Sequence, residues 1–207
     1  MRPFKSALEA SSYQHPASNG PWAQRRDETI SKMLEQGLEY PTLAEHPIAW
    51  AEDQDPFGHV MTQTYPHINA KCFLRLLESF EEQLKDRFPD FMKARGIGIM
   101  SNRLVLSMKR VVKYPDLLIT GVRLVEVRPD RIFFENELWS AQTKEMVAGF
   151  QMVAVFFNHH TGKKANLLEE GGVWADLHAS LLRRSAESNR TLGIWQEKQK
   201  RQNNGKL

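Results

Sequence analysis

The sequence predicts an α+β fold in which one antiparallel sheet is wrapped round a single long helix. Three observations predict it. Residues 65–88 carry apolar side chains at steps of three and four, with charged side chains on the other side, as in an amphipathic helix. Four apolar, strand-like segments follow, and short turns join them in sequence. A helix and a sheet with one apolar face each bury those faces against one another.

The segments before the long helix are short. Residues 1–21 contain three prolines and one glycine, which predicts an irregular leader. Apolar residues at helical spacing predict a short helix over residues 30–38 that packs on the main body. Residues 48–50 are expected to form a brief strand, which runs into the polar loop 52–58.

The long helix is expected to begin near Tyr65, because Pro66 is tolerated in a first helical turn, and to end at Pro89. Beyond residue 166 the chain becomes polar, and apolar residues from Trp174 onwards indicate a C-terminal helix. The strands between the two helices are expected to form an antiparallel meander over residues 104–112, 117–127, 131–140 and 145–157.

Composition excludes several classes of protein. The hydrophobic content of 41% is ordinary for a globular chain, and no apolar run approaches the roughly 18 residues of a membrane span. The single cysteine, Cys72, excludes an internal disulfide and favours a reducing, cytoplasmic location. The leader, rich in Arg and Ser, weakly resembles a mitochondrial transit peptide. Basic residues do not alternate with aromatic ones in a stripe, so nucleic acid is not the expected partner.

One motif resembles a known family. The stretch Trp-Ala-Glu-Asp-Gln-Asp-Pro-Phe-Gly-His-Val at residues 50–60, followed by Tyr65, resembles the loop of the 4-hydroxybenzoyl-CoA thioesterase family. The order of helix and strands over residues 45–168 is similar to that of the family. The resemblance implies a hotdog fold for 45–168, with residues 1–44 as leader and short helix and 169–207 as a helical extension with a basic tail.

The resemblance also implies a site. The second Asp of the motif, Asp55, corresponds to the catalytic carboxylate, which acts either as a nucleophile on the thioester carbonyl or as a general base for water. The backbone N–H of Thr62 would stabilise the oxyanion, and His59 would lie near the reaction. Met61 and Tyr65 are expected to contact the substrate. Relatives are homodimers or dimers of dimers with sites between subunits, and coenzyme A enters only as part of the substrate.

The motif departs from the family at one point. Many relatives have two asparagines after His-Val, where this chain has Met61 and Thr62. Two alternatives to hydrolysis therefore stay open. One is a lyase, dehydratase or isomerase acting on a CoA- or carrier-bound substrate, and the other is an acyl-binding protein without catalysis. Asp55 itself could also be only a turn-capping acid, and Asp53 is expected to shape the loop through a local hydrogen bond.

The remaining polar features permit fewer interpretations. Asp53, Asp55 and Gly58 fit the first half of an EF-hand, but Thr64 stands where the essential Glu is required, so no metal site is expected. The serine-nucleophile motif of α/β-hydrolases is absent. Four basic residues that flank the first long strand could meet the phosphates of coenzyme A, or could be a solvated sheet edge: Arg103, Lys109, Arg110 and Lys113.

Overall fold

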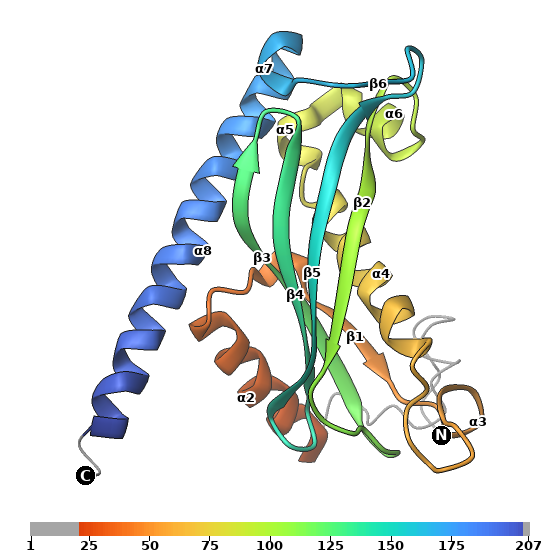
Figure 1. Cartoon of the computed structure of the whole chain (residues 1–207), viewed down its shortest axis with the longest axis vertical. Coiled ribbons are helices and arrows are strands. Elements are labelled where there is room, and N and C mark those ends of the chain that lie inside the picture. Colours follow the sequence, from red (N-terminus) through yellow and green to blue (C-terminus); the bar gives the residue numbers. More distant parts are fainter. Residues whose placement is uncertain (1–20, 205–207) are drawn as a thin grey trace.

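The computed structural model describes residues 21–204 and contains one curled antiparallel sheet with helices on both faces (Figure 1). The leader predicted for residues 1–21 lies outside the described residues, except for Pro21. The sheet order is β1-β3-β4-β5-β2, with β6 paired to β5. The strands are β1 (Ala44–Pro47), β2 (Ile97–Met108), β3 (Leu117–Arg128), β4 (Arg131–Ser140), β5 (Glu145–Asn158) and β6 (Lys163–Lys164).

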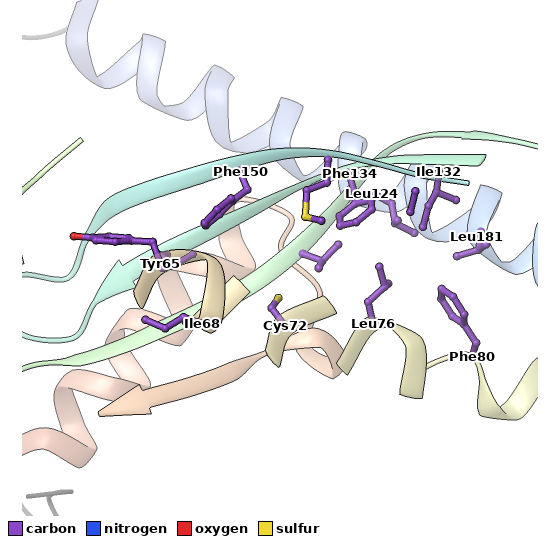
Figure 2. Close-up of a cluster of buried hydrophobic side chains, with 14 of the residues drawn as sticks. Tyr65, Ile68, Cys72, Leu76, Phe80, Leu124, Ile132, Phe134, Phe150 and Leu181 are labelled. Carbon is purple, nitrogen blue, oxygen red and sulfur yellow. The ribbon is translucent and has the colours of Figure 1, made fainter. Parts of the chain in front are cut away.

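The central helix α4 (Thr64–Glu78) packs its apolar stripe against the inner face of the sheet. Ile68, Cys72 and Leu76 are fully buried, and Figure 2 shows Cys72 and Leu76 pointing from α4 towards the sheet, where Phe134 lies. The spacing of four residues places these three side chains on one side of the helix. The helix and sheet therefore bury each other as the apolar patterns predicted.

The helical region is broken where a continuous helix over residues 65–88 was predicted. After α4 the chain forms α5 (Glu81–Leu84), the 3₁₀ helix η2 (Lys85–Arg87) and α6 (Phe88–Met92). The hydroxyl of Ser79 donates to the Leu76 carbonyl, a local bond that competes with helix continuation. Phe80 and Leu84 are still fully buried, so the apolar spacing continues beyond the end of α4 although the helix does not.

Two strand predictions were wrong. The first strand is β1, which ends at Pro47, and residues 48–50 lead instead into the short helix α3 (Trp50–Asp53). The strand β2 starts earlier than predicted and pairs with β5, so only β3, β4 and β5 form the expected meander. The eight-residue link 109–116 carries the chain from β2, at one edge of the sheet, past β5 and β4 to β3.

The other helices cover the rest of the sheet. Helix α2 (Pro21–Glu35) packs Ile30 and Met33 against the outer face, where Leu117, Ile119 and Trp139 point away from α4. The long helix α8 (Val173–Asn204) runs beside β3 and follows the short helix α7 (Leu167–Glu170). The 3₁₀ helix η1 (Tyr40–Thr42) precedes β1. No helix within residues 21–204 is long and apolar enough to cross a membrane.

Candidate functional site

The predicted site is a small hairpin between α3 and α4. The Met61 N–H donates to the Asp53 carbonyl at 2.8 Å, and Gln54 pairs with Val60 in an antiparallel bridge. The Asp55 N–H donates to the His59 carbonyl at 2.8 Å, which closes the turn. Gly58 has a φ of +74° in this turn, a conformation that side chains with a Cβ rarely adopt. Asp55 therefore sits at the tip of a hydrogen-bonded hairpin.

The carboxylate of Asp55 is held by its own turn. One oxygen, Oδ1, accepts hydrogen bonds from the backbone N–H groups of Phe57 and His59, both at 2.9 Å. The other oxygen, Oδ2, has no hydrogen-bond partner among residues 21–204. The side chain is half-buried. The geometry thus fixes the orientation of the carboxylate and leaves one oxygen available to a ligand or water.

The residues that follow Asp55 lead directly to the start of α4. His59 is half-buried, and its ring has no hydrogen-bond partner in the described part of the chain. Thr62 is exposed, and no acceptor among the described residues receives its backbone N–H. The next turn is α4, which begins at Thr64 and directs the positive end of its dipole this way. An N–H in this position is suited to an anionic oxygen.

Tyr65 differs from the other residues of the predicted site. Its side chain is only 3% exposed and belongs to the core cluster. Burial, assisted by the negative charge of Asp116, raises the pKa of Tyr65 above its ordinary value. Figure 2 shows the Tyr65 hydroxyl pointing away from the other labelled side chains. Its contact with a substrate stays a prediction, as does that of the half-buried Met61.

The predicted basic residues lie at two places. Lys109, Arg110 and Lys113 belong to the link after β2, and this link runs beside the hairpin, because the Val60 N–H donates to the Val112 carbonyl at 2.9 Å. All three side chains are exposed, and Arg110 forms an exposed ion pair with Glu145. Arg103 is also exposed but lies in the middle of β2. Three of the four cations therefore lie on the link that contacts the hairpin at Val60.

A buried polar chain beside the hairpin escaped the sequence reasoning. Asp53 accepts hydrogen bonds from the Ala49 N–H at 2.8 Å and from the Thr64 hydroxyl at 3.4 Å, and it contacts His46 Nε2 at 3.1 Å. The Lys71 ammonium lies 2.8 Å from His46 Nδ1. Burial opposes the charge of Asp53, but the bonds from His46 and Ala49 outweigh it and hold the pKa of this carboxyl below its ordinary value.

Only part of this buried polar chain of side chains could have been predicted from the sequence. The local bond of Asp53 was expected, and the structure shows it. His46 and Lys71 lie 25 residues apart, on β1 and α4, and carry no motif spacing. Within residues 21–204, no group of three or more His, Cys, Asp or Glu side chains could hold a metal ion. A groove of about 510 Å³ between the end of α2 and α8 lies away from the hairpin.

Comparison with known proteins identifies the family. A model of the thioesterase-like superfamily matches residues 49–175, which include the hairpin, α4 and the whole of β2 to β5. The chain belongs to the thioesterase-like superfamily. Membership in it classes the chain as an enzyme of the thioester hydrolase type. No curated protein sequence matches the chain significantly.

Solved structures agree on the fold. A DHNA-CoA thioesterase from Staphylococcus aureus is 16% identical with a TM-score of 0.56, and the match covers 70% of this chain and 93% of that one. A 1,4-dihydroxy-2-naphthoyl-CoA thioesterase from Synechocystis is 16% identical with a TM-score of 0.52, covering 66% and 94%. A Staphylococcus aureus protein solved in complex with CoA is 12% identical with a TM-score of 0.57, covering 71% and 87%. The predicted α+β hotdog fold is confirmed.

Proposed function

We propose that this thioesterase-like protein hydrolyses an acyl-CoA or acyl-carrier thioester through the carboxylate of Asp55. The observation that carries the proposal is the state of this carboxylate. Two backbone N–H groups orient it at 2.9 Å each, while its second oxygen is available beside the start of α4. A fixed carboxylate with one available oxygen suits either of two roles, as a nucleophile or as a general base.

Both roles give the same products. As a base, Asp55 takes a proton from water, the water oxygen bonds to the thioester carbonyl carbon, and the C–S bond breaks to release the thiol. As a nucleophile, Asp55 forms an acyl anhydride while the thiolate leaves, and water then cleaves the anhydride. In both, negative charge develops on the carbonyl oxygen, and we assign the Thr62 N–H to stabilise it together with the dipole of α4. We assign to His59, with an imidazole that has no partner among the described residues, the transfer of a proton near Asp55.

Coenzyme A is the thiol carrier that the surface best fits. Lys109, Arg110 and Lys113 are exposed on the link that runs beside the hairpin, and positive charges there would attract its phosphates. Arg103 would extend this charge along β2. One relative by structure was solved in complex with CoA, which supports the same choice. Hydrolysis by a carboxylate and water needs no further cofactor or metal.

The site is proposed to be completed by a second copy of the chain. The strand β2 is the last strand of the sheet, and it exposes Met100, Leu104 and Met108 along its length. Within the hairpin, the buried Gln54 Nε2 finds no acceptor among the described residues. An unpaired edge with apolar side chains and an unsatisfied donor are both met by a homodimer, or a dimer of dimers, with the two β2 strands side by side.

The test is thiol release from short, long and aromatic acyl-CoAs by the wild-type protein and by Asp55→Asn. We expect the variant to lose roughly hundredfold or more of the activity, because the amide can neither attack nor accept the proton. Asp86→Asn, in the exposed helix η2, serves as the matched control and keeps its activity. Circular dichroism verifies that both variants are folded.

Two results would contradict the proposal. Equal thiol release by the wild-type protein and Asp55→Asn would exclude this carboxylate from the chemistry. Absence of release with every substrate, combined with tight acyl-CoA binding, would favour the alternative of an acyl-binding protein or a lyase, which the replacement of both family asparagines by Met61 and Thr62 allows.

A further inference from the structure

The buried polar chain beside the hairpin joins three separate elements. Lys71 comes from α4, His46 from β1 and Asp53 from the end of α3. The side chains of His46 and Asp53 are only 12% and 10% exposed, and Lys71 is half-buried. Burying charged groups is costly unless each of them is paired. The cost of burying this set between α4, β1 and α3 therefore suggests that it has a functional role.

The chemistry of the three side chains decides which atom donates and which accepts in each hydrogen bond of this polar chain. A lysine ammonium has donors only, so the contact of 2.8 Å from Lys71 Nζ requires His46 Nδ1 to accept. The proton of the neutral imidazole then lies on Nε2, which donates to Asp53 Oδ2 at 3.1 Å. A positive and a negative charge are thus joined through one neutral ring. The imidazole of His67 is the other titratable group that faces His46, with ring centroids 6.0 Å apart.

The buried polar chain contacts the hairpin through Asp53. This residue forms the base of the hairpin, where its carbonyl accepts from the Met61 N–H at 2.8 Å. Its carboxylate is tied at the same time to the Ala49 N–H and to Thr64, the first residue of α4. Asp55 lies two residues further along, roughly 7 Å at the rise of an extended strand. Whatever fixes Asp53 therefore fixes the distance between the tip of the hairpin and the start of α4.

We propose that Lys71, His46 and Asp53 form a positioning relay, which locks the hairpin so that Asp55 and the Thr62 N–H face the same reacting carbonyl. This inference rests on the function proposed above and deepens it, because it assigns roles to residues that do not touch the substrate. Lys71 holds the tautomer of His46, His46 holds the carboxylate of Asp53, and Asp53 holds both strands of the hairpin. A misplacement of about 1 Å in such a site lowers the rate about hundredfold.

The first test needs no substrate. Amide hydrogen exchange of residues 55–62 is compared between the wild-type protein, His46→Gln and Lys71→Met. We expect exchange at the Phe57, His59 and Met61 amides to become about tenfold faster in both variants, the size expected when a hydrogen bond to a charged group is lost. His178→Gln, a buried histidine on α8, and Lys144→Met, a lysine paired with Glu28, are the matched controls and leave these amides unchanged.

The second test separates positioning from general stability. In the relay, His46→Gln and Lys71→Met lower kcat by at least tenfold with little change in KM, whereas Lys71→Arg, which keeps a cationic donor, restores much of the rate. The losses become much smaller in the background of Asp55→Asn, because one of the two groups that the relay positions is then already removed. Losses that multiply with Asp55→Asn would make the relay an independent catalytic unit and overturn the inference.

The two tests fail separately. Unchanged amide exchange in His46→Gln and Lys71→Met would overturn the relay even if Asp55 proves to be the catalytic carboxylate. Faster exchange confined to the hairpin, in a protein that releases no thiol from any substrate, would retain the relay as a device that shapes the loop and would reject only the proposed hydrolysis. Faster exchange throughout the chain would show a merely structural role and also overturn the inference.

Discussion

The two edges of the sheet are finished in different ways. At one edge, β1 pairs only with the first four residues of β3, so the rest of β3 would be left open. Helix α8 and the segment before β1 cover that part. Ser185 and Asn189 donate to the Val125 carbonyl at 3.0 and 2.9 Å, and the Glu39 N–H donates to the Val122 carbonyl at 2.8 Å. The carbonyls of Val122 and Val125 on this edge are therefore satisfied within the chain.

At the other edge nothing comparable covers β2 within residues 21–204. Seven of its twelve residues have exposed side chains, five of them consecutive at 100–104, and the seven include Met100, Leu104 and Met108. The charged residues that often protect a free edge gather at its end, in the link that begins with Lys109, and only Arg103 lies within the strand. The 32-residue helix α8 covers one edge, and the apolar side chains of the other edge favour the dimer proposed above.

The largest expected effect comes from placing a charge on the open edge. Leu104→Glu puts a carboxylate on β2 that a two-fold interface brings opposite its own copy, and like charges facing each other across strands are unfavourable. We expect the wild-type protein to sediment as a dimer or larger and Leu104→Glu as a monomer, with a dissociation constant raised by roughly hundredfold or more. Analytical ultracentrifugation measures both.

A matched control tests the comparison directly. Leu182 on α8 is 45% exposed, close to the 42% of Leu104, but it lies on the helix that covers the other edge. Leu182→Glu is expected to leave the assembly intact. A monomeric wild-type protein at micromolar concentration, or equal dissociation by both variants, would remove the distinction between the two edges.

The packing of α8 over the covered edge can be tested by creating a cavity beneath this helix. Leu181 is fully buried where α8 joins the core, and Leu181→Ala removes three heavy atoms from that packing. We expect a loss of about 2–5 kcal/mol in the free energy of unfolding, measured by urea denaturation with the assembly state held constant. Leu182→Ala, one residue further along, should change it by less than about 0.5 kcal/mol. Equal losses at both positions would mean that α8 is not anchored through Leu181.

The sequence predicted the elements whose signals are local. The meander of β3, β4 and β5 follows from apolar strands separated by short turns, and the boundaries of β4 at Arg131 and Ser140 agree with the prediction. The position of β2 beside β5 could not be predicted in this way, because it depends on which edge is left after β1 and α8 have taken theirs. Local patterns contain no information on that competition.

The site shows the same limit. Asp55 could be found because the motif around it is contiguous, and the hairpin that holds it is formed by residues four to eight positions apart. His46 could not, because its significance lies in contacts with Asp53 and Lys71, which come from two other elements. The same holds for Val112, whose carbonyl brings the basic link to the hairpin across 52 residues of sequence. Contacts between distant segments are created by the fold and leave no pattern behind.

The smallest expected effect concerns the bonds that seal the covered edge. Ser185→Ala and Asn189→Ala each remove one donor to the Val125 carbonyl, while the other donor remains, so each alone should cost about 0.5–1.5 kcal/mol of unfolding free energy. The double variant should cost more than the sum, because only then is the carbonyl left without a donor from α8. Val125 lies at the irregularity of β3 between Leu124 and Glu126, where the strand has no partner residue of its own in β4. Additive losses of unfolding free energy in the double variant would show that water replaces the Ser185 and Asn189 donors without penalty. In that case α8 would cover the edge through apolar packing alone.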